Sequence, residues 1–457
     1  MDVKKITLLY IALGIIFSTK VNAQFTDFLN YPLTVEPHES ADSTRGHFWG
    51  YMFGSYYTKV HVDSGKAGNT QYSQLPQGSN AFSMQRVYLG YDYFFNNQFS
   101  GHIVIAHEEN QDASFGSITS NYNYSPIFYL KYANIEWKNI FRGSTLSTGL
   151  ITTPSFAITE EPFWGYRSID RTIMDMKGIT NSNDFGVKLG GKLWRKKDDD
   201  GIENACIGYN IMVGNGLGST PDNFGIPTSY TVWKKYYGDI YVKLLNDKLV
   251  LDFFMDGRTL QWQNDSGVAQ HAYNITERIF LGYKTKNFNI SAEYFVQTEY
   301  NQFYTPSIAL APSLGAASDD IVVPVGGDTM HNIVQSGYSI MAAAVLLRDK
   351  NTKAPKLSLI ARYDFFNPCV GFNPLSFYQA TTIDGQPQTF TNVPYIKESY
   401  GVLGFDYQPI KQIHFMPNIW YDGITILNDP NLNLTAREKF DYDMVLRITF
   451  YYQLFKN

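Results

Sequence analysis

Residues Leu146-Ser147-Thr148-Gly149-Leu150-Ile151 run into Thr152-Thr153-Pro154, and the chain later reads Asp184-Phe185-Gly186-Val187-Lys188-Leu189-Gly190-Gly191-Lys192-Leu193. Both ends of this stretch alternate apolar and polar residues, which is typical of half-buried β-strands. Residues 153–183 between them are mostly polar, aromatic or charged. A connection of this length without regular structure is uncommon in a compact domain and is usually functional. The stretch therefore predicts two strands joined by a functional loop.

The first 23 residues have the pattern of a secretory signal. Lys4 and Lys5 precede an apolar run over 6–17, and Val21-Asn22-Ala23 fits the small-x-small rule for cleavage before Gln24. A membrane-spanning helix needs about 20 apolar residues, which is longer than this run. We expect residues 1–23 to be a cleaved signal peptide and residues 24–46 to be a periplasmic N-terminal lead-in.

The composition narrows the class of exported protein. Aromatic residues make up 16% of the 457 residues and charged residues 17%, and Phe is as abundant as Tyr. That balance suits a lipid-facing wall with girdles of aromatic side chains. Two cysteines are too few for a disulfide framework. A net charge of −5 gives no support to a nucleic-acid partner.

Strand-like segments follow one another to the end of the chain. Each is about ten residues long, the length that crosses a bilayer when the strand is tilted. In the last segment Leu446 and Ile448 take one face, while Arg447 and Thr449 take the other. We predict sixteen strands, at 47–60, 82–95, 98–108, 127–138, 145–152, 184–194, 204–213, 236–246, 249–258, 274–284, 287–299, 334–347, 356–366, 397–407, 411–422 and 441–455.

The connections between these segments alternate in length. Short ones, such as 96–97, 246–248, 284–287 and 408–411, alternate with long ones at 61–81, 109–126, 153–183, 214–235, 259–273, 300–333, 367–396 and 423–440. Outer-membrane barrels alternate in this way because their periplasmic turns are short and their outer loops long. Residues 47–457 therefore predict an all-β fold, a transmembrane antiparallel β-barrel of about 16 strands with short periplasmic turns and long extracellular loops.

Several short motifs carry a family resemblance over residues 82–191. They are Arg86-Val87-Tyr88-Leu89-Gly90, Tyr132-Ala133-Asn134-Ile135, Gly149 with Pro154, Arg167 with Arg171, and Gly186-Val187. With them the chain resembles an outer-membrane porin and is most similar to the phosphate-selective porin O/P family. The resemblance implies a water-filled lumen and a third long loop, residues 153–183, folded into it. The resemblance leaves open whether the protein assembles as a homotrimer.

The candidate site is a pore constriction formed by this loop. Its charged residues are Glu160, Glu161, Arg167, Asp170, Arg171, Asp175 and Lys177. We expect cations and carboxylates to face each other across the channel and to order passing solutes. The alternative is a set of ordinary surface ion pairs, worth ~0–1 kcal/mol each. Alternation on the strands predicts further lumen-facing side chains at Arg86, Asp184, Lys188, Lys192 and Arg447.

Enzymatic chemistry has little support in the sequence. The eight histidines are scattered, and neither G-x-S-x-G nor H-E-x-x-H occurs. Asp198-Asp199-Asp200-Gly201 resembles half of a calcium loop but lacks the glutamate at the spacing of an EF-hand. We therefore expect no catalytic residues, no metal site and no cofactor.

Two functions remain open from the sequence. One is a porin in the bacterial outer membrane that passes small polar or charged solutes and ions by diffusion. The other is a barrel that acts mainly as a binding or adhesion module through long external loops such as 300–333 and 367–396. In both cases the expected partners include outer-membrane lipid and lipopolysaccharide, and nucleic acid is not among them.

Overall fold

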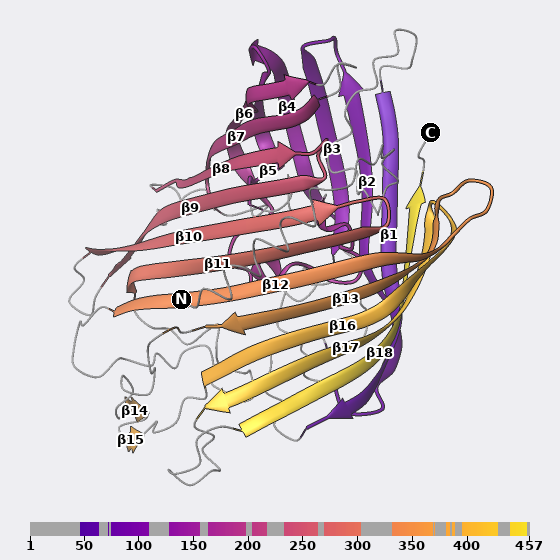
Figure 1. Cartoon of the computed structure of the whole chain (residues 1–457). Helices are drawn as coiled ribbons and strands as arrows, with labels where there is room; N and C mark the ends of the chain where they lie inside the picture. Colours follow the sequence, from indigo (N-terminus) through magenta and orange to yellow (C-terminus); the bar gives the residue numbers. More distant parts are fainter. Residues whose placement is uncertain are drawn as a thin grey trace, which may run out of the picture.

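The computed structural model describes residues 46–63, 72, 75–108, 128–155, 163–197, 203–216, 233–263, 269–302, 331–368, 370, 381–383, 386–388, 395–427 and 439–454. The expected signal peptide and, apart from Gly46, the expected lead-in lie outside these ranges. Within them, one closed antiparallel barrel of sixteen strands forms almost the whole structure. Figure 1 shows the strands wrapping around a common interior.

Each of the sixteen strands predicted from the sequence corresponds to one strand of the barrel wall. The wall strands are β1 (Gly46–Val62), β2 (Asn80–Phe94), β3 (Phe99–Glu108), β4 (Tyr129–Phe141), β5 (Ser144–Thr152), β6 (Asn183–Lys197), β7 (Glu203–Gly214), β8 (Lys235–Leu244), β9 (Leu249–Gln263), β10 (Ala269–Lys284), β11 (Phe288–Gln302), β12 (His331–Arg348), β13 (Pro355–Asn367), β16 (Tyr395–Ile410), β17 (Ile413–Leu427) and β18 (Lys439–Leu454). A short hairpin of β14 (Thr381–Ile383) and β15 (Gln386–Gln388) stands apart from the wall. The predicted fold class is confirmed.

Neighbours in the chain are neighbours in the wall, and the ends of the chain close it. β1 pairs with β18 from Gly50 opposite Leu454 to Val62 opposite Asp443, so the first and last strands have no unpaired edge along this register. Closure matters because an unpaired backbone edge costs several kcal/mol for each exposed group in lipid. Within the described ranges, no helix is long and apolar enough to cross a membrane.

One predicted connection is wrong. The sequence predicted a long loop over 259–273, but β9 continues to Gln263 and β10 begins at Ala269. Gln263 lies opposite Ala269. The hydrogen-bonded ladder of β9 and β10 therefore extends beyond residues 249–258 and 274–284, the strands that the apolar alternation predicted. Apolar alternation ends where lipid ends, whereas backbone pairing can continue into water.

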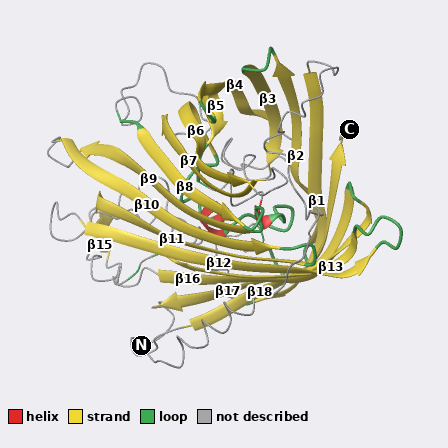
Figure 2. Cartoon of the chain, turned by 45° about the horizontal axis from the view of Figure 1, so that its top comes forward, coloured by secondary structure: helices red, strands yellow, loops and turns green. Residues whose placement is uncertain are grey.

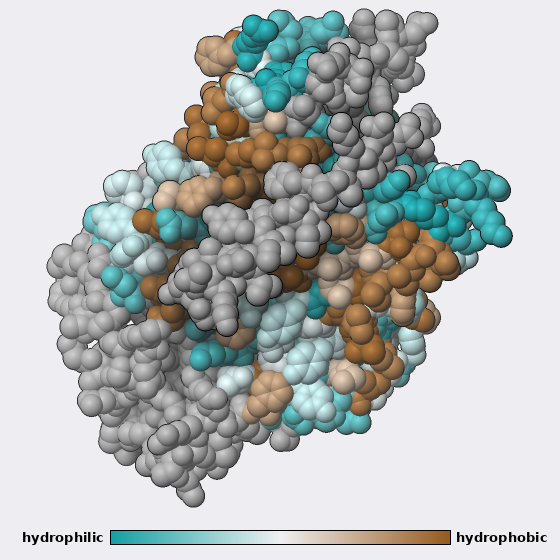
Figure 3. All heavy atoms as spheres, viewed as in Figure 1, coloured by the Kyte–Doolittle hydropathy of each residue, from teal (hydrophilic) through white to brown (hydrophobic). Residues whose placement is uncertain are grey.

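The wall has an apolar outer face and a polar and aromatic inner face. On β18 Leu446 and Ile448 are exposed, while Arg447 and Thr449 are buried. The same alternation gives exposed Phe253 and Met255 on β9. The brown surface in Figure 3 shows apolar side chains gathered on the outer face of the strands. In a bilayer these side chains contact lipid, and the buried ones point into the barrel.

A glycine next to the candidate site is required by the backbone. Gly149 on β5 has a φ of +118°, and a Cβ there would collide with the carbonyl oxygen of Ala133 on β4. Only glycine adopts such a conformation without strain. The glycine therefore lets β4 and β5 approach closely three residues before β5 ends at Thr152.

Candidate functional site

Residues 163–182, which make up most of the described part of the connection between β5 and β6, are here called the inner loop. Its described helical residues are Phe163, Trp164 and the turn α4 (Ile173–Met176). Figure 2 shows this turn inside the ring of strands. The inner loop contacts inward-facing side chains on distant strands, including Asn289 on β11, Arg362 on β13 and Glu398 on β16. It therefore crosses the interior rather than lying over the rim.

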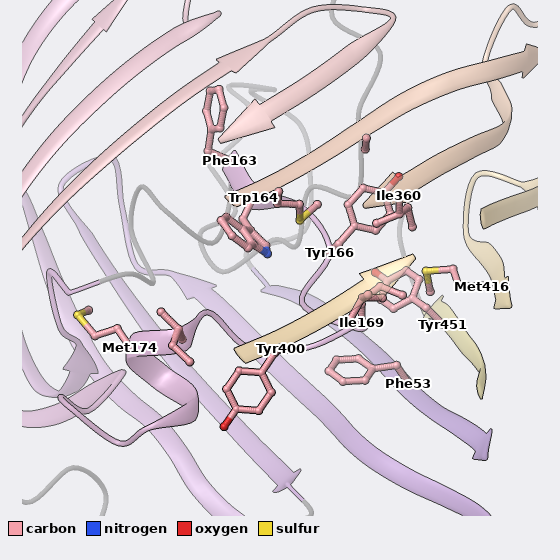
Figure 4. Close-up of a cluster of buried hydrophobic side chains, with 14 of the residues drawn as sticks. Phe53, Phe163, Trp164, Tyr166, Ile169, Met174, Ile360, Tyr400, Met416 and Tyr451 are labelled. Carbon is pink, nitrogen blue, oxygen red and sulfur yellow. The ribbon is translucent and has the colours of Figure 1, made fainter. Parts of the chain in front are cut away.

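Apolar side chains fix the inner loop against the wall. Those of the loop that are buried are Phe163, Trp164, Tyr166, Ile169, Ile173, Met174 and Ile179. They form one cluster with side chains of the wall such as Ile360, Tyr400 and Met416 (Figure 4). Phe163 meets Phe280 edge-on, with 5.9 Å between the ring centroids. It occupies space left by Gly282, where a Cβ would collide with the Phe163 ring.

Side chains of the wall also satisfy the backbone of the inner loop. The Asn289 amide donates to the carbonyl oxygens of Phe163 at 3.0 Å and Trp164 at 3.3 Å. Arg447 donates to the carbonyl oxygen of Ile169 at 3.1 Å, and Gln297 donates to that of Ile179 at 3.0 Å. Buried carbonyl groups need such partners, because leaving one unpaired costs about 1–3 kcal/mol. These contacts hold the loop by its main chain as well as by its side chains.

Four charged residues of the inner loop lie against groups of opposite charge. Arg167 contacts Asp175 within the loop, at 2.5 Å between Nη1 and Oδ2. Lys177 pairs with Glu398 of β16, and both side chains are buried. The carboxylate of Asp170 lies 3.9 Å from Arg447. The backbone carbonyl of Arg171 accepts a hydrogen bond from Arg362. The expected Glu160 and Glu161 lie outside the described residues.

In the part of the chain that the structure describes, cations outnumber carboxylates where the inner loop approaches β2 and β4. Arg86 and Lys131 both reach Glu108 of β3, at 3.0 and 3.3 Å. Burial raises the pKa of Asp175, but the surrounding Arg167, Arg171, Arg86 and Lys131 hold it below its usual value. Four cations thus act on two carboxylates. We call these residues the basic cluster: Arg86, Lys131, Arg167 and Arg171, with Glu108 and Asp175.

The strand positions expected in the lumen lie on the inner face. Asp184 is fully buried and accepts hydrogen bonds from the Gly216 amide at 2.6 Å and the Tyr237 hydroxyl at 2.9 Å. Lys188 donates to the carbonyl and hydroxyl oxygens of Thr152 at 2.9 and 2.8 Å. Arg86 and Arg447 are buried as described above, and Lys192 is partly buried.

Sequence reasoning missed several partners of the inner loop. Glu398 binds Lys177, and Asp406 accepts a hydrogen bond from the Tyr166 hydroxyl at 3.3 Å. Asp256, which the alternation over 249–258 predicts to face the lumen, accepts a hydrogen bond from Thr180 at 2.6 Å and pairs with Lys235 at 2.7 Å. Alternation could have marked Glu398 and Asp406 as inward-facing, because Leu403 and Phe405 between them face outward. Nothing in the pattern says which loop residue each would meet.

One polar group on the inner face has the outline of a hydrolase triad. The Ser100 hydroxyl lies 3.1 Å from Nε2 of His102, whose Nδ1 lies 2.8 Å from Asp92. However, Ser100 is 1% exposed, and Glu136 lies 3.4 Å from the same Nε2. A substrate has no access to that hydroxyl. Among the described residues no group of His, Cys, Asp or Glu is arranged to hold a metal ion.

No protein-family model and no curated protein matches the chain. Solved structures do match over nearly the whole length. The outer membrane channel DcaP of Acinetobacter baumannii aligns with a TM-score of 0.53 and 10% identity, covering 90% of this chain and 97% of that chain. OprB of Pseudomonas putida aligns with a TM-score of 0.51 and 9% identity, covering 90% and 94%. At this identity the likeness shows the fold, and that fold is the barrel of outer-membrane channels.

Proposed function

We propose that the protein is an outer-membrane porin. Small polar or charged solutes and ions would diffuse through its lumen, which residues 153–183 narrow. The observation that carries this proposal is the inner loop itself, a segment bound across the interior of a transmembrane barrel. A barrel that served only as an external docking module would have no use for charged groups fixed inside the ring of strands.

The way the inner loop is held supports a permanent constriction. Apolar side chains, hydrogen bonds to carbonyl groups and the pair of Lys177 with Glu398 all tie it to strands on the far wall. A loop held by so many independent contacts keeps its position while solute passes. Charges that border a narrow aqueous path act more strongly than charges on an open surface, because the effective dielectric constant is lower there.

The basic cluster supports a finer assignment. Among the described residues, four cations around two carboxylates leave an excess of positive charge beside the inner loop. Rings of cationic side chains favour anions in pores. This excess fits the resemblance of residues 82–191 to the phosphate-selective porin O/P family, and small anions such as phosphate are the solutes that we propose. We further propose export with cleavage of residues 1–23, and contact with outer-membrane lipid and lipopolysaccharide. Assembly as a homotrimer is part of the same proposal.

Conductance in a planar bilayer tests the proposal. The purified barrel should give steady single-channel currents, and a salt gradient should give a reversal potential that indicates anion preference. Arg167→Ser with Arg171→Ser removes two cations and much side-chain volume, so conductance should rise and the preference should move toward cations. Arg195→Ser with Lys196→Ser removes the same charge at an exposed strand end and should have less effect. A barrel without steady current would instead favour the docking module.

A further inference from the structure

The short connections of the barrel carry exposed cations directly beside exposed apolar side chains. The clearest case lies at the ends of β12 and β13. Leu346 and Leu347 are both exposed at the end of β12, where the register with β13 shifts. Phe288 at the start of β11 is also exposed. These three side chains extend the lipid-facing surface to the end of the wall.

Four lysines follow this apolar edge. Lys350 and Lys353 lie in the turn between β12 and β13, Lys356 lies at the start of β13, and Lys286 lies in the turn between β10 and β11. All four are exposed. Figure 3 shows the turn after β12 as a teal projection beside brown side chains, on the right of the view. We call these lysines with Leu346, Leu347 and Phe288 the rim patch.

Arg348 joins the two turns into one surface. Its guanidinium donates to the carbonyl oxygen of Lys353 at 2.7 Å and to that of Lys286 in the neighbouring turn. It also lies 3.3 Å from the side-chain oxygen of Asn287. The arginine is therefore used to fix the turns. The lysine side chains are exposed, and each carries its charge as a compact ammonium group on a flexible stem. Such groups can bind phosphate.

Asp349 is the one acidic residue in these described turns, and backbone amides of its own turn bind its carboxylate. Asp349 accepts hydrogen bonds from the amides of Asn351 at 2.9 Å and Thr352 at 2.8 Å, and from the Thr352 hydroxyl at 3.1 Å. The Thr352 and Asn351 amides hold the pKa of Asp349 below its usual value. Its carboxylate shapes the turn, and its single negative charge, on which Lys356 also acts, stands against four lysines. The rim patch therefore keeps a net positive charge.

We propose that the rim patch binds the headgroups of anionic phospholipids in the leaflet that meets the short connections. Lysine stems can lie along the exposed leucines while their ammonium groups reach the phosphate level of the bilayer. A soluble acidic partner would not need the apolar edge, which continues directly into the lipid-facing wall. The inference rests on the transmembrane barrel and on the proposed orientation of the short connections toward the phospholipid leaflet. It does not depend on conduction.

A tryptophan reporter in the patch allows a direct test. Leu347→Trp replaces one exposed apolar side chain by another, and its fluorescence is read as the increment over the unsubstituted protein. The full barrel is reconstituted in equimolar phosphatidylglycerol and phosphatidylcholine, with bromine on the chains of one lipid at a time. The ratio of quenching gives the relative binding constant at the patch. One cation near the membrane surface contributes about 1 kcal/mol to the binding of anionic lipid, which is about fivefold in the binding constant. We therefore expect the patch to prefer phosphatidylglycerol by about fivefold or more.

Two matched variants separate charge from structure. Lys350→Gln, Lys353→Gln and Lys356→Gln together should bring the preference close to one. Arg at the same three positions should keep it. In 1 M salt, where the screening length is about 3 Å, the preference of the native patch should also collapse.

Equal quenching by both lipids in the native patch would overturn the proposal, as would a preference that survives the triple Gln variant.

The competing partner is peptidoglycan, whose peptides carry carboxylates. If native barrel binds purified sacculi, the triple Gln variant does not, and no lipid preference is found, then the patch contacts the cell wall and the lipid assignment is wrong. A lipid preference in a barrel that gives no current would refute the porin function while leaving this inference standing.

Discussion

The pair of Lys177 with Glu398 offers a direct measure of how firmly the inner loop is held. Their side chains are 5% and 6% exposed, and the ammonium group lies 5.2 Å from the ring centre of Phe366 and 5.1 Å from that of Tyr400. Lys177→Met removes the cation but keeps much of its volume. Breaking a buried pair by removing one partner costs about 3–5 kcal/mol, because the remaining charge is left uncompensated.

This cost should appear as local opening of the inner loop rather than as unfolding of the barrel. The wall strands retain their hydrogen bonds, whereas the loop loses one of its anchors. Since 1.4 kcal/mol is a factor of ten, the open population should rise about 100-fold to 1,000-fold or more. The amides of Met176, which donates to Thr172 at 2.8 Å, and Ile179, which donates to Met174 at 3.1 Å, report that opening.

Hydrogen–deuterium exchange with mass spectrometry measures the effect on peptides from residues 163–182. Protection there should fall by the stated factor in Lys177→Met, while peptides from β16 change little. Lys350→Met, an exposed lysine in a short turn, is the matched control and should leave the loop protected. Lys177→Met combined with Glu398→Gln removes both charges and should recover part of the protection. Unchanged exchange in the single variant, or a double variant worse than the single, would refute this account of the loop.

Four further outcomes follow from the same structure. Unboiled protein should migrate differently from boiled protein on a denaturing gel, because the closed wall resists detergent; identical migration would contradict the fold. Ile448→Arg places a charge on the lipid face and should cost about 2–4 kcal/mol and impair assembly in vesicles, whereas Thr449→Ser on the inner face should assemble normally. Gly282→Val should push Phe163 off the wall and cost about 1–3 kcal/mol, seen as faster exchange at 163–166; Gly257→Ala, where a Cβ meets only ordinary contacts, should not. The pKa of Asp175 in the folded protein lies below its value of about 3.9 in the unfolded chain. The stability that Asp175 contributes is therefore complete above the unfolded pKa. It is lost as the pH falls through the folded pKa. Loop exchange, corrected for its intrinsic pH dependence, should therefore not change between pH 7 and pH 5 through this group.

The wall could be predicted from sequence because its signal is local. Each strand shows its facing within a few residues, as Leu446 and Ile448 do against Arg447 and Thr449. Lipid on one side and the interior on the other impose that alternation strand by strand. The error over 259–273 has the opposite origin. Pairing of Gln263 with Ala269 depends on backbone hydrogen bonds, which leave no apolar pattern in the residues that make them.

The inner loop could be located from the sequence, but its contacts could not. Lys177 and Glu398 are 221 residues apart, and Ile169 and Arg447 are 278 apart. They meet only because the barrel closes and brings β16 and β18 opposite β5. No pattern near the loop encodes that meeting. The polar residues of the wall show that they face inward, and only the folded chain shows which loop atom each one reaches.

In the described contacts, charged groups of the loop lie against partners in the loop or the wall, and the expected arrangement across the channel, which also involves Glu160 and Glu161, stays a prediction. A buried charge without a partner is costly, so each charged group takes the nearest compensating group that the fold supplies. For Arg167 that group is Asp175 in the same loop, and for Lys177 it is Glu398 in the wall. Among the described residues, the unbalanced charge that remains after these pairings lies in the basic cluster. There Arg86 and Lys131 act on both Asp175 and Glu108, and Arg171 acts on Asp175. The field that a passing ion meets is therefore set by the excess that remains after pairing. That excess requires the positions of β2, β3 and β4, and the loop sequence alone cannot reveal its sign.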